Sequence, residues 1–225
     1  MTPKLVIFDV DGTLIDSQAH ITASMDTAFA ANGMVPPTRE QTLSVVGLSL
    51  PVAMARLAPD HAEKTDALVA SYKEAFATLR MQGDGVALSP MFPGALEVLH
   101  QLHASPDILL AIATGKSRRG LDHLLDLHGL ARLFHSVQVA DDHPSKPHPS
   151  MVEACLRETG VEGRNAVILG DTTYDIEMGL SGGIHAIGVA WGYHPAETLT
   201  TAGASTVLTR FDALPPVLDR IFGQS

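Results

Sequence analysis

Two aspartates, Asp9 and Asp11, stand two positions apart where an apolar stretch of the chain ends. The stretch reads VIFDVDGTLIDS from Val6 to Ser17, so the carboxylates interrupt a run with the composition of a buried strand. An unpaired buried charge costs several kcal/mol, so two of them at one strand end require a compensating function. A spacing of two places both side chains on the same side of an extended strand, about 6–7 Å apart. Gly12 then permits a turn that opens the site.

Other residues suited to metal and phosphate chemistry follow later segments of strand character. Thr114 ends the apolar segment DILLAIAT, Lys146 stands between Pro144 and Pro147, and the run GDTTYD carries two further acids. Carboxylates gathered at one sheet edge repel one another unless a cation lies among them, and Mg²⁺ prefers such oxygen ligands together with waters and phosphate oxygens. A lysine and a hydroxyl suit the oxygens of a transferred phosphoryl group. The candidate residues are Asp9, Asp11, Thr114, Lys146, Asp171 and Asp175.

The spacing of apolar residues predicts the elements that position these side chains. Residues 4–8 predict a buried strand. Residues 17–32 and 61–81 show helical periodicity, and no strand pattern occurs between about residue 16 and Pro90. The first strand is therefore followed by a long helical insertion.

After Pro90 the pattern changes to alternating strands and helices. Alternating βα units imply a parallel sheet covered by helices on both faces, with ligands bound outside the carboxyl ends of the strands. We therefore expect an α/β fold, in which a Rossmann-like parallel-sheet core of residues 1–15 and 91–225 carries an inserted all-helical domain of residues 16–90. The expected later strands lie at 107–114, 135–140, 166–170 and 184–190, with a weak βα unit near 206–222.

The composition limits the possible partners of the protein. The 225 residues carry a net charge of −10, 45% of them are hydrophobic, and one is a cysteine, which excludes an intramolecular disulfide. The acidic balance argues against binding of nucleic acid, which needs a basic stripe. No apolar run approaches the length of a membrane span, and the N-terminus lacks the long apolar stretch of a signal peptide. We expect a soluble, cytoplasmic protein whose partner is a small phosphorylated metabolite.

The candidate residues also carry a family resemblance. In order, DVDGT, the strand end at Thr114, Lys146 and GDTTYD resemble the four motifs of the haloacid dehalogenase-like hydrolases, and the resemblance covers the whole chain, including a helical cap after the first motif. It implies that Asp9 is the nucleophile that forms an aspartyl-phosphate, and that Asp11 is the general acid and then the base. Dehalogenases lack an acid at the position of Asp11, so the resemblance favours phosphate chemistry.

The same resemblance assigns the remaining residues of the site. Thr114 and Lys146 would hold the phosphoryl group, with Gly115 and Lys116 beside them as substrate-binding residues. The family often has an asparagine where this chain has Gly115, so one side-chain contact is missing. Mg²⁺ would be the cofactor, and its expected ligands are Asp9, the backbone carbonyl of Asp11, Asp171 and, in support, Asp175.

Three functions remain open. The resemblance favours a Mg²⁺-dependent phosphatase for a small phosphorylated metabolite, either phosphoglycolate-like or a sugar phosphate. The alternatives are a sugar phosphomutase similar to β-phosphoglucomutase and a non-catalytic phosphate-sensing module. Phosphomutases of this kind resemble G-x-S-R in the cap, whereas this chain reads GLSL at residues 47–50, with Leu50 in place of the arginine. Arg56 lies further along and need not face the site, so hydrolysis is favoured.

Several other residues have both a structural and a functional interpretation. The run GKSRRG places Arg118 and Arg119 in the first turn of a helix, where they either attract an anion or form a solvated face. His143 and His148 flank Lys146 and belong either to a transition-metal site or to a turn-rich loop. We interpret as packing residues Cys155, Trp191 and Tyr193.

Overall fold

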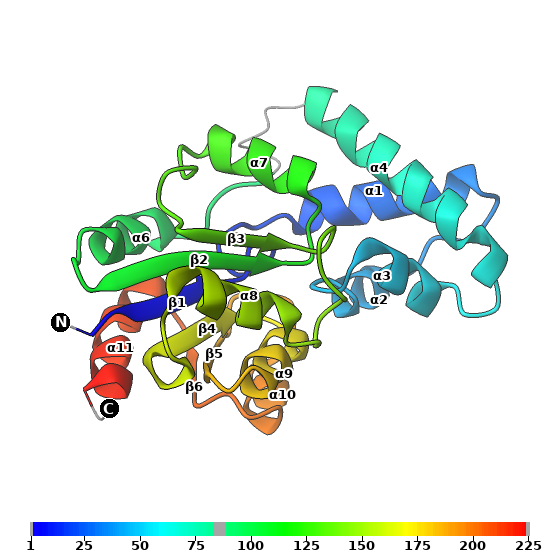
Figure 1. Ribbon diagram of the computed structural model, residues 1–225. Coiled ribbons are helices and arrows are strands. Elements are labelled where there is room, and N and C mark those ends of the chain that lie inside the picture. Colours follow the sequence, from blue (N-terminus) through cyan, green and yellow to red (C-terminus); the bar gives the residue numbers. More distant parts are fainter. Residues whose placement is uncertain (1, 83–88, 224–225) are drawn as a thin grey trace.

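The computed structural model describes residues 2–82 and 89–223, and a parallel sheet forms its centre. The strand order is β3-β2-β1-β4-β5-β6, and every neighbouring pair is parallel (Figure 1). The first strand of the chain therefore lies in the middle of the sheet, and the expected α/β fold is confirmed. The strands are β1 (Lys4–Phe8), β2 (Ile108–Thr114), β3 (Ser136–Val139), β4 (Ala166–Gly170), β5 (His185–Val189) and β6 (Thr206–Leu208).

The register of the three central strands brings their carboxyl ends together. Phe8 of β1 pairs with Ile112 of β2 on one side and with Leu169 of β4 on the other. The backbone N–H of Asp9 donates a hydrogen bond to the carbonyl of Leu169 at 2.9 Å, which holds the start of the following loop against β4. The polar residues that follow β1, β2 and β4 thus share one edge of the sheet.

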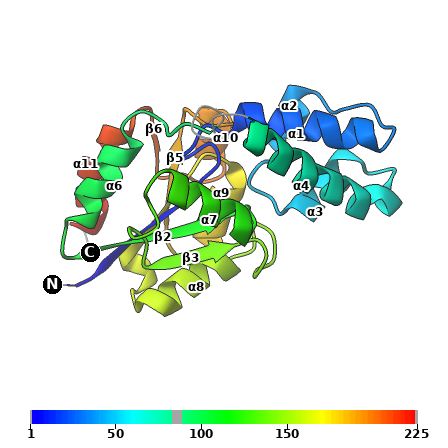
Figure 2. The ribbon, with the colours of Figure 1, turned by 90° about the horizontal axis from the view of Figure 1, so that it is seen from above.

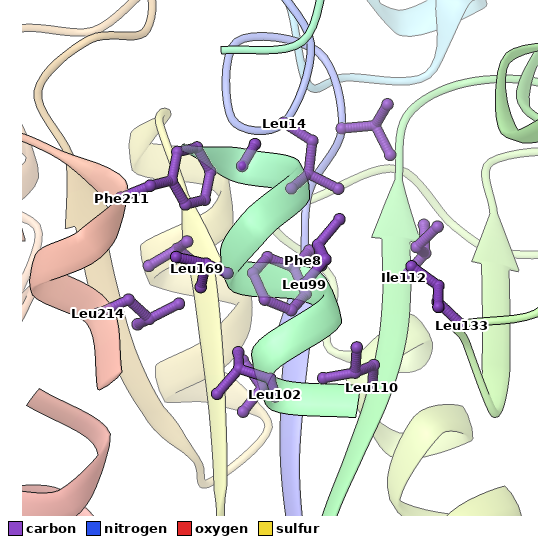
Figure 3. Packing of buried hydrophobic residues seen from close by; sticks show 14 of the residues in the cluster. Phe8, Leu14, Leu99, Leu102, Leu110, Ile112, Leu133, Leu169, Phe211 and Leu214 are labelled. Carbon is purple, nitrogen blue, oxygen red and sulfur yellow. The ribbon is translucent and has the colours of Figure 1, made fainter. Parts of the chain in front are cut away.

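Helices cover both faces of the sheet, because successive side chains of each strand point to opposite faces. Val6 and Phe8 face a core formed with α6 (Ala95–His103), α7 (Arg118–Leu127) and α11 (Leu214–Phe222), part of which Figure 3 shows. Leu5 and Ile7 face a second core formed with α8 (Ser150–Thr159), α9 (Thr173–Ser181) and α10 (Ala196–Thr201). The central strand is thereby buried on both sides, which fixes the position of the residues at its end.

The helical insert, defined here as α1 to α4, lies beyond the carboxyl edge of the sheet (Figure 2). It has a hydrophobic core of its own, which includes Met25, Phe29, Met54 and Leu68. The helix predicted over residues 61–81 begins at Thr65, after a short 3₁₀ turn. The helices are α1 (Gln18–Ala31), α2 (Arg39–Ser44), α3 (Leu50–Leu57) and α4 (Thr65–Gln82).

Two backbone hydrogen bonds join the chain segments that enter and leave the insert. The N–H of Phe92 donates to the carbonyl of Leu14 at 2.9 Å, and the N–H of Asp16 donates to that of Pro90 at 2.8 Å. The two connections therefore run side by side between insert and sheet. The domain limits at residues 15 and 91 stay a prediction.

The helix α6 begins at Ala95, directly after Gly94, and buries Ala95, Val98, Leu99 and Leu102, whereas Leu96 is exposed. Within residues 2–82 and 89–223, no helix combines the length and the apolar character needed to cross a membrane.

Candidate active site

A tight turn after β1 presents the first two acids. Gly12 has φ of +87°, a left-handed conformation that favours glycine, and a side chain at this position would collide with the carboxylate of Asp171. The hydroxyl of Thr13 donates to Asp171 Oδ1 at 2.9 Å. The turn after β1 and the acid after β4 therefore pack directly against each other.

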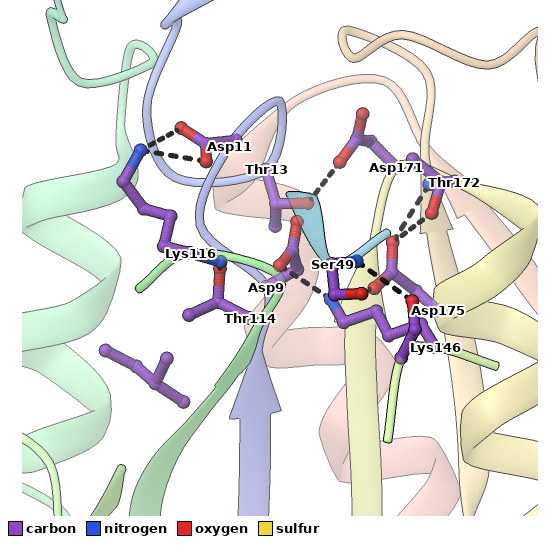
Figure 4. Close-up of polar contacts among 12 residues, drawn as sticks. Asp9, Asp11, Thr13, Ser49, Thr114, Lys116, Lys146, Asp171, Thr172 and Asp175 are labelled. Atoms are coloured by element: carbon purple, nitrogen blue, oxygen red, sulfur yellow. Dashed lines mark hydrogen bonds and ion pairs between the residues drawn. The ribbon is translucent and has the colours of Figure 1, made fainter. Parts of the chain in front are cut away.

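Lys146 connects two buried carboxylates at the centre of the site (Figure 4). Its ammonium group donates to Asp9 Oδ1 at 2.7 Å and to Asp175 Oδ1 at 2.6 Å, and all three side chains are buried. The other oxygen of Asp175 accepts from the backbone N–H and the hydroxyl of Thr172, at 3.1 and 2.7 Å. Asp175 therefore fixes Lys146 and also caps the start of α9.

Burial raises the proton affinity of the acids in this cluster. Burial raises the pKa of Asp9 to about 7; Lys146 opposes this shift, and Asp175 and Asp11 add to it. Burial, with the neighbouring charges of Asp9 and Asp175, also holds the pKa of Asp171 well above its usual value. For Lys146, burial lowers the pKa, but Asp175 and Asp9 outweigh it, so the net shift is upward. The lysine stays charged and is shared by the carboxylates of Asp9 and Asp175.

The acids have the chemistry of a divalent-metal site. Asp9, Asp171 and Asp175 each offer an oxygen, and these oxygens lie within 4.8 Å of one another. Asp9 Oδ2 is buried and has no hydrogen-bond partner among the described residues. A cation would offset the excess negative charge, and hard oxygen donors suit Mg²⁺. The trio therefore fits the expected metal, and Asp9 Oδ2 is the atom left free for a ligand or for attack.

Asp11 lies outside this trio. Its carboxylate accepts from the hydroxyl of Ser17 at 2.5 Å and from the ammonium group of Lys116 at 2.8 and 2.9 Å. The contact with the metal that the resemblance assigns to its backbone carbonyl stays a prediction. Thr114 is buried at the end of β2, and its hydroxyl oxygen accepts from the N–H of Lys116 at 3.3 Å. The predicted residues thus meet at one edge, in two adjacent groups.

A cavity of about 550 Å³ lies between these residues and the helical insert. Asp9, Asp11, Thr114 and Lys116 line it from the sheet, and residues of α1, α3 and α4 line it from the insert. The N–H of Ser49 donates to the hydroxyl of Ser145 at 2.9 Å. The insert is therefore seated on the strand ends and shields the cavity.

A second contact between insert and sheet passes through one tyrosine. The guanidinium of Arg56 donates to the hydroxyl of Tyr174 at 2.6 Å, and that hydroxyl donates to the carbonyl of Ser44 at 2.9 Å. Arg56 therefore links the insert to α9 through Tyr174. Among the described residues that line the cavity, Arg56 is not found.

The close approach of the insert leaves no room for a side chain at Gly115, where the family often has an asparagine. A Cβ atom at Gly115 would lie 2.6 Å from the carbonyl oxygen of Gly47 and 2.8 Å from that of Leu48. Both neighbours are backbone atoms of the insert, so a side chain at position 115 would push the insert away. The missing side-chain contact is therefore replaced by a close approach of the insert itself.

The basic run at the start of α7 is divided between two roles. Arg118 donates to the carbonyl of Val137 at 3.0 Å and to Asp142 at 3.2 Å, whereas Arg119 lines the cavity. Only Arg119 of this pair is therefore placed to attract an anionic substrate.

The two histidines near Lys146 do not form a metal site. His143 bonds to the hydroxyl of Ser150 at 2.8 Å and to the side-chain oxygen of Gln138 at 2.9 Å, and the ring nitrogen of His148 accepts from the N–H of Ser150 at 3.2 Å. Over the described ranges, no group of histidines, cysteines or acids besides the aspartate trio has metal-binding spacing. The hydrogen bonds of both histidines agree with the interpretation as a turn-rich loop.

The expected packing residues hold that role. Cys155 is a buried residue of α8 and packs in the second core. The indole N–H of Trp191 donates to the carbonyl of Thr13 at 3.0 Å, and the backbone N–H of Tyr193 donates to Asp171 Oδ2 at 2.9 Å. The loop after β5 thus supports the turn and the acid that form the site.

Four residues of the site were not singled out by the sequence: Thr13, Ser17, Ser145 and Thr172. For Thr172 a signal exists, because a threonine three positions before an acid at a helix start is a capping box. Ser17 and Ser145 act through contacts that the fold alone creates.

Comparison with known proteins identifies the family. A family model described as haloacid dehalogenase-like hydrolase matches residues 6–189. The chain belongs to this family. It is 34% identical over 211 residues to the "Probable phosphatase IndB" of Dickeya dadantii, which covers 92% of this chain and 90% of that protein. It is 28% identical over 226 residues to "Phosphoglycolate phosphatase 1" of Pseudomonas aeruginosa, covering 97% of this chain and 80% of that one.

Solved structures agree with the fold of this hydrolase. A hydrolase from Pseudomonas syringae superposes with a TM-score of 0.84 at 24% identity, covering 98% of this chain and 99% of the other. A haloacid dehalogenase-like family protein from Streptococcus pneumoniae superposes with a TM-score of 0.77 at 21% identity, covering 92% and 94%. At these identities the likeness concerns the fold, a parallel-sheet core with a helical insert.

Proposed function

We propose that this hydrolase is a Mg²⁺-dependent phosphatase that cleaves a small phosphorylated metabolite through an aspartyl-phosphate. One observation supports this most strongly. Asp9 has one oxygen held by Lys146 and a second, buried oxygen without a hydrogen-bond partner among the described residues. A carboxylate that is fixed on one side and free on the other is positioned as a nucleophile.

The residues of the site divide the reaction into two steps. Asp9 Oδ2 attacks phosphorus while Asp11 gives a proton to the departing alcohol oxygen, which leaves an aspartyl-phosphate and a free alcohol. Asp11 then takes a proton from water, the water oxygen attacks phosphorus, and Asp9 is released with inorganic phosphate. Thr114 and Lys146 bind the phosphoryl oxygens.

Asp9 and Asp171, with Asp175 in support, would hold Mg²⁺. The ion, when bound, supplies positive charge that offsets the carboxylates and the phosphoryl oxygens. The insert covers part of the cavity through its contacts with the strand ends, which limits the access of bulk water to the reacting groups.

The phosphomutase alternative has less support from the cavity. Leu50 lines the cavity at the position where the resembling mutases have arginine, and Arg56 binds Tyr174 instead. A mutase must hold a second phosphate of its substrate, and an apolar leucine supplies no charge for it. Hydrolysis, with departure of the alcohol, therefore fits this wall better.

The decisive experiment measures phosphate release from a panel of phosphomonoesters. The wild type should release phosphate with Mg²⁺ and lose activity with a chelator. Asp9→Asn should lower the rate by at least about 10⁴-fold, because the nucleophile acts as a unit with its neighbours. Asp16→Asn, which changes a partly exposed acid of the same loop, is the matched control and should retain activity.

Three outcomes would contradict this proposal. Undiminished turnover in Asp9→Asn or in chelator would exclude the mechanism. Conversion of a hexose 1-phosphate to the 6-phosphate with little free phosphate, in the presence of a trace of bisphosphate, would identify a mutase. Binding of phosphate without turnover of any ester would identify a phosphate-sensing module.

A further inference from the structure

The cavity, called the chamber from here on, carries information about the alcohol half of the substrate. Its volume is about 550 Å³, and Asp9 and Thr114 line one side of it. Cavities of about 300–1,000 Å³ hold ligands of drug size, so a phosphoryl group with a two-carbon alcohol fills a small part of it. The wall that the insert contributes is mainly apolar and includes Ile21, Met25, Val46, Leu48, Ala53 and Phe76.

The cations that line the chamber are either paired or at least partly exposed to solvent. Lys116 is held by both carboxylate oxygens of Asp11, at 2.8 and 2.9 Å. Lys73 and Arg119 are exposed, and Arg80 is partly exposed. A leaving group that is itself a small acid therefore finds, among the described residues, no buried and unpaired cation beside the phosphoryl position.

The aromatic part of the wall is held rigidly. The ring of His20 stacks on the ring of Phe76 with centroids 3.5 Å apart and planes 12° apart. A ring nitrogen of the same histidine lies 3.0 Å from the carbonyl oxygen of Phe76. Phe76 is thus fixed in position before any substrate enters, which favours a ligand of complementary apolar shape.

Three hydroxyl-bearing residues of the insert, Thr42, Ser49 and Tyr72, interrupt the apolar wall. Thr42 and Tyr72 line the chamber, and neither hydroxyl forms a hydrogen bond with another described residue. Burial holds the pKa of Tyr72 above its usual value, so its hydroxyl remains a donor at neutral pH. The wall therefore offers apolar contact together with neutral hydrogen-bond donors.

We propose that the preferred substrate is a phosphomonoester whose alcohol is bulky and largely apolar and carries a neutral hydrogen-bond acceptor that Thr42 and Tyr72 bind. This inference rests on the proposed phosphatase function and specifies its substrate class. It also separates the chain from an enzyme for phosphoglycolate, whose leaving group is short and charged. Each methylene that fills an apolar pocket changes kcat/KM by about 10–200-fold, so the effect of size is large.

The first test compares esters of primary alcohols with Mg²⁺ present. The probes are phosphoglycolate, ethyl phosphate, 3-phenylpropyl phosphate and 2-phenoxyethyl phosphate. The last two have the same length, but the methylene next to the ring in 3-phenylpropyl phosphate is replaced by an ether oxygen in 2-phenoxyethyl phosphate. We expect kcat/KM for 2-phenoxyethyl phosphate to exceed that for phosphoglycolate and ethyl phosphate by at least about 10²-fold. We expect it to exceed that for 3-phenylpropyl phosphate by about fivefold, the effect of one neutral hydrogen bond.

Substitutions in the wall test the same inference. Ala77→Phe adds a ring to the chamber wall and should lower the ratio of the bulky to the small esters by at least about tenfold. Ala70→Phe adds the same ring at an exposed position of α4 and is the matched control. The double variant Tyr72→Phe/Thr42→Val should remove the preference for the ester with the ether oxygen. It tests the inference independently if Ala77→Phe does not fold.

The possible failures are distinguishable. If phosphoglycolate is cleaved as well as or better than 2-phenoxyethyl phosphate, the inference is overturned and the phosphatase remains. An unchanged ratio in folded Ala77→Phe overturns it as well. If the enzyme with Mg²⁺ cleaves none of the four esters, the proposed function fails together with the inference.

Discussion

The two sides of the chamber are built in different ways. The floor is polar and buried: Asp9, Asp11 and Thr114 line the chamber, and the buried side chains of Lys146, Asp171 and Asp175 adjoin them. Short hydrogen bonds join Lys146 to Asp9 and Asp175. The roof, which is the face of the insert toward the chamber, is mainly apolar and contacts the floor through a few backbone and hydroxyl groups. In the proposed function, the floor carries the chemistry and the roof selects what is bound there.

The floor and the roof depend on single residues in different ways. A buried ion pair fails when either partner is removed, because the other charge is left uncompensated. An apolar wall changes gradually with the volume of each side chain. We therefore expect floor substitutions to affect every substrate and roof substitutions to affect the choice among substrates.

The largest effect is expected for Lys146. Lys146→Met should lower kcat/KM for all esters by about 10²–10³-fold, since it removes a fixed donor to the phosphoryl group. It also leaves Asp9 and Asp175 without their shared cation, which should destabilise the fold by about 3–5 kcal/mol at pH 8. Chemical denaturation and steady-state kinetics measure both, with Lys64→Met as control. A loss below threefold in rate would place the phosphoryl group elsewhere.

The second prediction concerns pH and metal. In the folded protein the pKa of Asp9 is about 7, above its ordinary value of 3.8, and that of Asp171 is shifted in the same direction. The stability that these protonated acids contribute is fully present below about pH 4 and is lost as pH rises through 7. Each pKa unit corresponds to about 1.4 kcal/mol.

Thermal denaturation without divalent metal should therefore show a Tm that falls between pH 5 and 8. Mg²⁺ should raise Tm more at pH 8 than at pH 5, because it binds the deprotonated acids. Asp9→Asn should flatten the pH dependence. A Tm that rises with pH in the metal-free wild type would contradict the raised pKa values of Asp9 and Asp171 in the folded protein.

The junction of floor and roof is tested at Gly115. Gly115→Ala places a methyl group 2.6 Å from the carbonyl oxygen of Gly47, so the insert has to shift. We expect a loss of at least about tenfold in kcat/KM, since small misplacements of reacting groups are costly. Gly120→Ala, whose Cβ would lie 3.2 Å from the hydroxyl of Ser117, should have a smaller effect. Equal kinetics for Gly115→Ala and the wild type would show that close seating of the insert is not needed.

The smallest effect is expected at the mouth of the chamber. Arg119→Ala should raise KM about two- to threefold at low ionic strength, with little change in kcat, and the difference should vanish at high salt. Arg118→Ala is the matched control, because that side chain is bound to Val137 and Asp142. An equal KM for both variants at low salt would make the basic turn a solvated face.

The floor could be predicted from the sequence because short strands and their ends are encoded locally. Asp9 and Asp171 each follow an apolar strand and Thr114 ends one, and parallel strands bring such ends to one edge. Lys146 was found from its motif and not from a strand. What the pattern did not provide was the division of the acids, in which Asp11 joins Lys116 and Ser17 instead of the metal trio.

The roof could not be predicted in the same way. Ile21, Met25 and Phe76 repeat at helical intervals, and periodicity does not distinguish a face that packs in a core from one that lines a chamber. The close approach at Gly115 depends on how the insert docks, which no local pattern encodes. The sequence therefore predicted the fold and the residues proposed for the chemistry, and it gave no pattern for the face of the insert on which the proposed substrate class depends.

In the proposed function, the free oxygen of Asp9 becomes phosphorylated during turnover. The most direct measurement is an acid quench of the enzyme turning over a cleavable ester with Mg²⁺, followed by mass spectrometry of the peptide that contains Asp9. We expect one added phosphoryl group on that peptide, and none with chelator or in Asp9→Asn. Full turnover with the phosphoryl group on another peptide, or undiminished turnover in Asp9→Asn, would contradict this mechanism.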